Sequence, residues 1–344
     1  MIDVIHIGDY KTGSSWLQRC LFKHHPDILY IDNPEEFPYV ARLFNELVDV
    51  ADIHFDEVSF RERFSLCLSQ SEAAHRQLLV SRESLFGDFI TSNNAERTAR
   101  RLKNVFHQSQ VIIVIREQLS MLSSIYSEYI KCGGTLKFSK FIWDPIVSKG
   151  LLNRLNYSAV IETYKAYFGE ENVLVKIYDD FICDKVDFSN DILKFIDCKE
   201  MKTEEFDSLD YQIVNPSLRS FGLSLHRWLN HLIRTRYNPS ASIIAWEYLA
   251  KKCISDVKLE ALVDRYMVHV PKVYEHKYHG AYLDYALHQS ANRYISKLCE
   301  KFNFGSKILI SEHDRKEIIS YFVADNNKLI KEHSLDIASY GWIC

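Results

Sequence analysis

The sequence predicts an α/β fold in which a parallel β-sheet is flanked by helices, with a helical C-terminal part. Short apolar runs rich in β-branched residues alternate with segments whose apolar residues recur at helical spacing. Runs without polar alternation are typical of strands covered on both faces, and their alternation with helices indicates right-handed βαβ units. The predicted strands are VIHI (4–7), ILYI (28–31), QLLVS (77–81), QVIIVI (110–115) and NVLVKIY (172–178).

Helices are predicted between these strands, and strand-like runs stop at about residue 186. The last predicted helix opens with the capping box Ser311-x-x-Asp314. No repeat or Pro/Gly-rich linker divides the chain, so we expect one domain over 1–344, made of an α/β core (1–205) and a mainly helical region (206–344). The predicted helical segments are 15–22, 120–130, 157–168, 187–196, 217–233, 258–267 and 314–333.

Composition and charge exclude several function classes. The 344 residues carry a net charge of −4, which offers no basic field for nucleic acid or for an anionic membrane surface. The eight cysteines form no C-x-x-C pair, so neither a zinc cage nor a disulfide framework is expected. No basic leader and no run of about eighteen apolar residues occurs, which predicts a cytoplasmic protein without a membrane span.

The turn after the first strand, GDYKTGSSW (8–16), has the composition of an anion-binding loop. Backbone N–H groups, two serine hydroxyls and one ammonium can all face an anion at the start of a helix. The nucleotide-binding P-loop places Ser or Thr directly after Gly-Lys, whereas the order here is Lys11-Thr12-Gly13-Ser14-Ser15. A solvated strand–helix turn with an N-cap serine is the alternative interpretation.

Charged and aromatic residues follow the other predicted strands. Arg82 and Glu83 follow the third strand, Arg116 follows the fourth, and Tyr178 ends the fifth. Ser124 lies eight residues after Arg116, inside the next predicted helix. Each has an ordinary structural explanation when taken singly. Ligands of parallel α/β folds bind at the carboxyl ends of the strands, however, so their convergence with the loop favours a site at that edge.

These motifs resemble those of the sulfotransferases that use 3′-phosphoadenosine-5′-phosphosulfate (PAPS). In that family a K-[ST]-G-[ST]-[ST]-W loop after the first strand holds the 5′-phosphosulfate, and it corresponds to Lys11 to Trp16 here. An arginine that ends a later strand and a serine eight residues further on hold the 3′-phosphate, and they correspond to Arg116 and Ser124. The resemblance covers about residues 1–200. It implies the P-loop NTPase-like sulfotransferase fold, PAPS as the donor, a hydroxyl-bearing acceptor and no metal requirement.

The resemblance also implies roles for single residues. Lys11 reaches the oxygen that bridges phosphate and sulfate, while Ser14, Ser15 and the loop amides hold the 5′-phosphate. Trp16 stacks on adenine, and Tyr178, which begins the element YDDF, makes a further adenine contact. The family's late RKG tripeptide is missing here, and VNPSLRS (214–220) is the first segment to consider in its place.

Attack by an acceptor hydroxyl on sulfur needs a group that takes its proton. Family members that act on phenols and steroids use a histidine after the third strand, where this chain has Glu83 in SRESLF. Glu83 is therefore the predicted base, as in carbohydrate-directed and many bacterial members; pairing with Arg82 or Arg116 is its structural alternative. Asp9 and a histidine of 269–288 are the other candidate bases.

The glutamate favours a saccharide or glycoconjugate acceptor, and a small-molecule secondary metabolite is the alternative. Two further interpretations come from other classes. A variant P-loop kinase would need magnesium and a Lys-Ser/Thr pair, which the loop lacks. A non-catalytic nucleotide-binding protein would bind the donor without turnover.

Two further groups of residues have possible chemical roles. Six tyrosines and four histidines crowd 266–294, among them His276 and His279 at a spacing that can hold a metal on a helix. No further acid or cysteine completes a metal pattern, so a polar–aromatic surface or an acceptor cleft is the expected role. Three arginines suit either an acidic acceptor or a solvated helix face and stay unassigned; they are Arg227, Arg234 and Arg236.

Overall fold

The computed structural model of the chain describes residues 2–33, 36–68, 76–87, 94–145, 147–208, 219–231 and 310–344. The chain divides into two compact units. The first, called the sheet unit below, comprises 1–121, 142–214 and 315–344, and the second comprises 122–141 and 215–314. The expected single domain over 1–344 stays a prediction.

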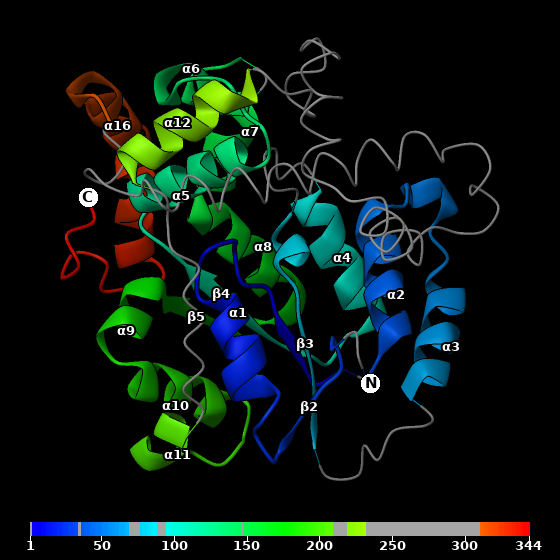
Figure 1. Ribbon diagram of the computed structural model, residues 1–344. Coiled ribbons are helices and arrows are strands. Elements are labelled where there is room, and N and C mark those ends of the chain that lie inside the picture. The colour runs from blue at the N-terminus through cyan, green and yellow to red at the C-terminus, as the bar shows by residue number, and fades with distance from the viewer. Residues whose placement is uncertain are drawn as a thin grey trace, which may run out of the picture. The chain divides into compact units, whose positions relative to one another are not determined.

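The sheet unit is built on a five-stranded sheet in which all strands are parallel (Figure 1). The strand order is β2-β3-β1-β4-β5, so β1 lies at the centre, between β3 and β4. The predicted fold class is confirmed, and each predicted strand is present with its ends moved by at most one residue. The strands are β1 (Val4–His6), β2 (Ile28–Tyr30), β3 (Gln77–Ser81), β4 (Gln110–Ile115) and β5 (Val173–Ile177).

Helices connect the strands, as the βαβ pattern predicts. The helix after β1 is unusual, because α1 (Ser14–Trp16) continues directly as a π-helical segment, η1 (Leu17–Phe22). The 3₁₀ turns are η2 (Asp52–His54), η3 (Glu83–Phe86) and η4 (Glu170–Asn172). The other helices of the described ranges are α2 (Pro38–Asp49), α3 (Glu57–Leu68), α4 (Ala95–Val105), α5 (Gln118–Lys131), α6 (Phe138–Ile142), α7 (Val147–Arg154), α8 (Tyr157–Phe168), α9 (Tyr178–Cys183), α10 (Lys185–Phe195), α11 (Thr203–Ser208), α12 (Ser220–Asn230) and α16 (Glu312–Lys331).

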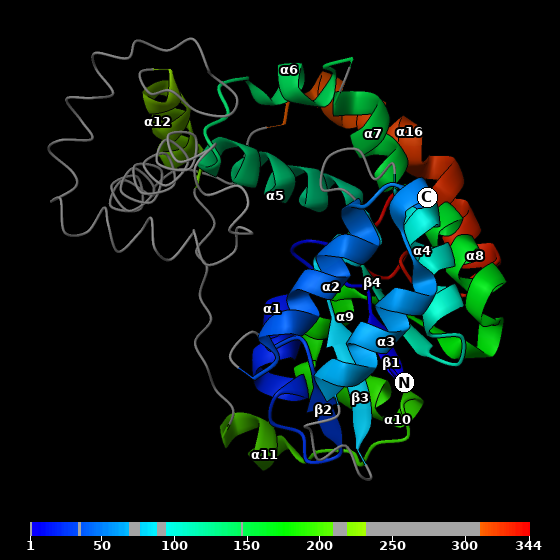
Figure 2. The same cartoon turned by 90° about the vertical axis from the view of Figure 1, so that its right-hand side faces the viewer.

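The strands lack polar alternation because helices cover both faces of the sheet. On one face, η1, α9 and α10 pack with strand side chains such as Leu79 and Ile112 into one buried cluster. On the other face, α4 and α8 pack together and α8 lies against β4 and β5 (Figures 1 and 2). Val111 to Ile115 of β4 are fully buried as a result.

The strand order brings the predicted site residues to one edge. β1 and β3 pair His6 with Ser81, and β4 and β5 pair Ile115 with Ile177. Because all strands point the same way, the segments that follow them leave the sheet at the same edge. The loop 8–16 leaves it at the centre, between the ends of β3 and β4.

In the later part of the chain the described residues form the helices α12 and α16, and 332–344 follow as turns and irregular backbone. α12 falls in the predicted segment 217–233, and α16 matches 314–333. The predicted capping box is present, since the Asp314 amide donates to Ser311 Oγ at 3.1 Å. Several predictions lie outside the described residues, namely helix 258–267, the tyrosine–histidine cluster of 266–294, residues 214–218, Arg234 and Arg236. None of the helices in the described ranges combines the length and apolar character that crossing a membrane needs.

Candidate active site

The loop after β1 turns through left-handed backbone conformations. Lys11 has a φ of 63° and Gly13 a φ of 84°. The left-handed backbone favours glycine at position 13, and a Cβ there would also make a tight contact of 3.3 Å with the Phe181 ring. Residues that alternate between right- and left-handed conformations direct successive backbone N–H groups toward one point, which is how such loops bind anions.

The hydroxyls of the loop are not equivalent. Thr12 Oγ1 donates to the Asp9 carbonyl at 2.6 Å and so closes the turn. Ser14 Oγ makes only long contacts within the loop, at 3.4 Å to the Asp9 carbonyl and to Thr12 Oγ1. Both side chains are buried. The Thr12 hydroxyl is therefore committed to the loop, while the Ser14 hydroxyl is better able to turn toward an anion.

An uncharged network lies under the loop. His6 Nδ1 is 2.7 Å from Ser81 Oγ, which also accepts from Gln18 Nε2 at 3.1 Å. Complete burial lowers the pKa of His6 to about 3, so the imidazole is neutral at ordinary pH. A Cβ at Gly8 would lie 2.4 Å from Ser14 Oγ and 2.6 Å from the His6 ring. Glycine at position 8 therefore leaves room for these two side chains to pack against the backbone there. Sequence reasoning gave His6 no role.

Asp9 is bound by an arginine that sequence reasoning missed. The Asp9 carboxylate and the Arg154 guanidinium form an ion pair in which neither side chain is exposed. Arg154 also donates to the Gly87 carbonyl at 3.3 Å and packs 5.1 Å from the centre of the Phe86 ring. Because Arg154 compensates the charge of Asp9, this acid does not cancel the positive field of Lys11. The pairing and enclosure also make Asp9 a poor candidate for the base.

Arg116 joins three of the predicted motifs. Its Nη1 donates to the Lys11 carbonyl at 2.9 Å, and its guanidinium carbon lies 4.8 Å from the centre of the Tyr178 ring. Its Nε and Nη2 donate to Ser120 Oγ at 3.0 and 2.6 Å. The partners of this guanidinium are therefore a carbonyl, a hydroxyl and an aromatic face. Among the described residues no salt bridge joins this cation to a carboxylate, although the Glu117 carboxylate lies near enough to interact with it electrostatically.

The Arg116 guanidinium binds Ser120, a serine to which the sequence analysis gave no role. Ser124 lies one turn further along α5, on the same helix face as Ser120, and it belongs to the second unit. Its predicted role stays a prediction. The spacing of four residues between Arg116 and Ser120, at the start of a helix, was the signal that could have found Ser120. Glu117 is committed to the helix start, since its carboxylate accepts from the Leu119 and Ser120 amides at 2.9 and 2.6 Å.

Aromatic side chains surround the start of α1. The Trp16 ring meets the Phe181 ring edge-on at 5.3 Å between centroids. It also lies nearly parallel to the Phe206 ring, at 6.2 Å and 16°. Tyr178 stacks on Phe181 at 5.8 Å. The two predicted adenine contacts, Trp16 and Tyr178, thus belong to one aromatic cluster beside Gly13.

Glu83 begins the η3 turn directly after β3. Tyr164 of α8 stabilises this turn, because its hydroxyl donates to the Leu85 carbonyl at 2.9 Å. The neighbouring Arg82 is directed toward α2, because it donates to the Ala41 carbonyl at 2.8 Å and lies 3.5 Å from Asp32. The structure thus ties Arg82 to α2 and Arg116 to the loop. The role of Glu83 as base stays a prediction.

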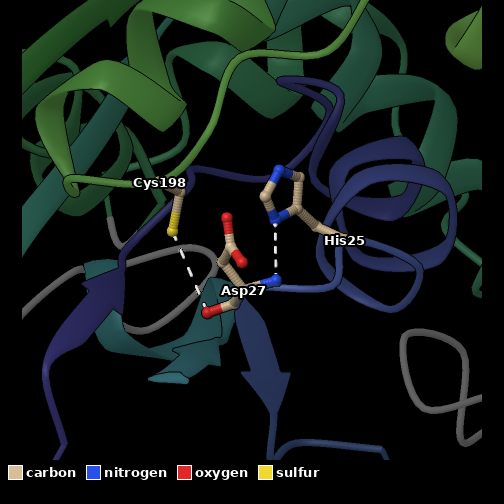
Figure 3. Close-up of side chains that lie close together, drawn as sticks. All are labelled: His25, Asp27 and Cys198. Carbon is tan, nitrogen blue, oxygen red and sulfur yellow. Dashed lines mark hydrogen bonds between the residues drawn. The ribbon is translucent and has the colours of Figure 1, made fainter. Parts of the chain in front are cut away.

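A separate polar cluster lies where β2 begins, at the sheet edge opposite the loop (Figure 3). The possible ligand atoms of His25, Asp27 and Cys198 lie within 4.8 Å of one another, the one such group of three found in the described ranges. His25 Nε2 donates to the Lys199 carbonyl at 2.8 Å, and its Nδ1 accepts from the Asp27 amide at 3.2 Å. Burial, then the Asp27 and Asp197 carboxylates, raise the pKa of the Cys198 thiol to about 12. With both ring nitrogens engaged and the thiol protonated, this cluster is a hydrogen-bonded clamp between β2 and the segment after α10.

No family model matches the chain, and no curated protein matches it either. Among solved structures, the chain is similar to a sulfotransferase from Alicyclobacillus acidocaldarius, with 17% identity, 61% of this chain and 90% of that one covered, and a TM-score of 0.43. It is also similar to a mouse sulfotransferase complexed with PAP (13% identity, 60% and 62% covered, TM-score 0.33). A third likeness is to sulfotransferase STF1 from Mycobacterium tuberculosis (14% identity, 66% and 76% covered, TM-score 0.34). These likenesses name the family that the sequence motifs resemble, and at such scores they carry no statement about the reaction.

Proposed function

We propose that this protein is a sulfotransferase that moves the sulfuryl group of PAPS to an acceptor hydroxyl. One observation carries the proposal. The Arg116 guanidinium binds the Lys11 carbonyl and lies over the Tyr178 ring, so three motifs that are far apart in the sequence meet at one sheet edge. A guanidinium held beside an aromatic ring, next to a loop whose sequence includes a lysine, suits a purine nucleotide that carries anionic groups at two positions.

The residues present fit this donor. The left-handed turns at Lys11 and Gly13 arrange the loop amides for an anion. The Ser14 hydroxyl has only long contacts inside the loop, and Arg154 compensates the buried charge of Asp9. When bound, the donor supplies an activated sulfuryl group.

The loop residues act on the reacting end of the donor. Lys11 stabilises the negative charge that develops on the leaving phosphate oxygen. A sulfuryl group carries less negative charge than a phosphoryl group, so one ammonium takes the part that kinases share with magnesium. Ser14, Ser15 and the backbone amides of Thr12 and Gly13 hold the 5′-phosphate.

The other strand ends recognise the nucleoside. Arg116 binds the 3′-phosphate with Ser124, and Ser120 fixes the orientation of the guanidinium. Trp16 and Tyr178 contact the adenine from the aromatic cluster. Of these residues, Ser120 was not predicted from the sequence.

Glu83 removes the proton of the acceptor hydroxyl. As the acceptor oxygen forms its bond to sulfur, the bond between sulfur and the 5′-phosphate oxygen breaks and leaves its electron pair on the phosphate. The proton moves to the Glu83 carboxylate. Two hydrogen bonds that position the η3 turn support this role, since Tyr164 and Arg154 donate to the carbonyls of Leu85 and Gly87.

The proposed acceptor is a hydroxyl of a saccharide or glycoconjugate, and a small secondary metabolite is the other candidate. The test is calorimetric titration with the product nucleotide, 3′,5′-adenosine diphosphate (PAP), followed by transfer of radiolabelled sulfuryl groups from PAPS to a panel of both acceptor types. Transfer in the presence of EDTA supports the proposal. Binding without transfer to any acceptor supports a non-catalytic protein, and a need for ATP with magnesium supports a kinase.

A further inference from the structure

Residues 337–343, called the tail segment below, follow α16 and fold back onto the sheet unit. Figure 1 shows this segment, coloured red, near α9. Ile337 is fully buried and Trp342 is 4% exposed, so two apolar side chains anchor the segment. The Trp342 amide donates to the Ile337 carbonyl at 3.3 Å, through a turn in which Gly341 has a φ of 75°. The tail segment is thus an ordered part of the sheet unit.

Two side chains of the tail segment bind the carboxylates that follow Tyr178. Trp342 Nε1 donates to Asp179 Oδ2 at 3.2 Å. The Tyr340 hydroxyl donates to Asp180 Oδ1 at 2.7 Å. Both acids lie in the first turn of α9, where negative charge also suits the helix dipole. The two bonds therefore fix the start of α9, and with it the Tyr178 ring.

The same segment also contacts the end of β4. The Trp342 ring lies 6.3 Å from the Tyr157 ring, and the Tyr157 hydroxyl donates to the Arg116 carbonyl at 2.8 Å. A second connection runs through Asn326. Its Nδ2 donates to the Ile343 carbonyl at 2.7 Å, and its Oδ1 accepts from Gln118 Nε2 at 2.6 Å. One segment thus holds the residues that follow both β4 and β5.

We propose that Trp342 and Tyr340 are positioning residues for the Arg116–Tyr178 pair and thereby set the affinity of the site for the 3′-phosphate, an inference that rests on the proposed function. Beyond the last ladder pair of β4 and β5, the sheet no longer joins the two strand ends, whereas the tail segment does. The bond from Trp342 also engages the carboxylate of Asp179, the residue that directly follows Tyr178.

The test compares ring-preserving variants. Trp342→Phe keeps an aromatic ring at this buried position, with some loss of packing, and removes the N–H group, and Tyr340→Phe removes one hydroxyl. Tyr321→Phe is the matched control, since it removes a bond of the same kind, from the Tyr321 hydroxyl to Asn153 at 2.9 Å. Titration with PAP and with AMP gives the preference for the 3′-phosphate. We expect the Trp342→Phe/Tyr340→Phe double variant to bind PAP about three- to tenfold more weakly. AMP shares the adenine contact of Tyr178 but lacks the 3′-phosphate, so its affinity should fall by less, and the control should be unchanged.

A preference for PAP that stays the same while the melting temperature falls overturns the inference, because the tail segment then only stabilises the fold. Amide hydrogen exchange of the ligand-free protein separates this failure from failure of the proposed function. We expect the double variant to exchange faster than wild type at 116–120 and 178–181, and Tyr321→Phe to match wild type there. If wild type binds PAP and AMP equally, the proposed function fails, and the exchange result still decides whether the tail segment holds the two strand ends.

Discussion

At the scale of single residues, the partners of a charged side chain indicate whether it stabilises the fold or is able to bind a ligand. The Asp9–Arg154 pair is fully buried, and removing either partner leaves an uncompensated charge that costs about 3–5 kcal/mol of stability. Arg116, by contrast, is bound by a carbonyl and a hydroxyl, so its positive charge is not neutralised by these partners. The first arrangement stabilises the loop, and the second leaves a cation able to bind an anion.

Lys11→Ala should abolish most sulfuryl transfer, with a much smaller loss of PAP binding. In the proposed function the ammonium acts on charge that develops only in the transition state, so we expect turnover to fall by about 10²–10³-fold or more. Lys185→Ala is the matched control, because this ammonium lies 5.9 Å from the Trp16 ring and outside the loop. Single-turnover rates and titration with PAP measure the two effects. Equal losses of rate and affinity would show that Lys11 contributes ground-state binding instead.

Glu83→Gln should lower turnover by about 10²–10⁴-fold while leaving nucleotide affinity nearly unchanged. The amide keeps the shape of the side chain and cannot accept the proton. Asp9→Asn is the informative comparison, since it breaks the buried pair with Arg154 and should lower the melting temperature. A Glu83→Gln variant that loses stability but keeps most of its rate would sink the assignment of the base.

At the scale of elements, His6 of β1, which lies beside Ser81 of β3 under the loop, makes the free energy of unfolding depend on pH. Burial lowers the pKa of His6 from 6.5 to about 3, so between these values the unfolded chain binds a proton that the folded chain does not. The free energy of unfolding should therefore fall by about 2 kcal/mol between pH 7 and pH 5 from this residue alone. His6→Asn keeps a polar atom near Ser81 and does not titrate, so urea unfolding at both pH values should show a smaller acid loss in the variant. The same acid loss in both proteins contradicts the expectation.

The elements also show which parts of the site a sequence can predict. The strands were predictable because apolar β-branched runs such as Val111 to Ile115 are buried on both faces. The loop and Arg116 were predictable because each lies directly after a strand, where chain order fixes position. Arg154 was not, since it reaches Asp9 across 145 residues from the end of a helix that the pattern did not predict. Such a partner is decided by tertiary packing, which no local pattern encodes.

At the scale of the whole molecule, the proposed function requires that the chain distinguish between closely related nucleotides. We expect PAP to bind about 10–100-fold more tightly than AMP, because a lost charged hydrogen-bond partner costs about 1.5–3 kcal/mol. Transfer from PAPS should continue in EDTA. A strict need for magnesium would favour the kinase interpretation, in which the metal carries the charge that the proposed function assigns to Lys11.

Arginine variants at the ends of β3 and β4 make this prediction specific. Arg116→Ala should abolish most of the preference for PAP, since its guanidinium lies at the loop and over Tyr178. Arg82→Ala should preserve that preference, because the Arg82 guanidinium donates to the Ala41 carbonyl and lies near Asp32. Both variants remove one positive charge from the same edge of the sheet, so a general electrostatic effect predicts equal losses. Titration of each variant with both nucleotides decides between recognition of the 3′-phosphate by Arg116 and attraction by net charge, and equal losses would remove the main support for the proposed site.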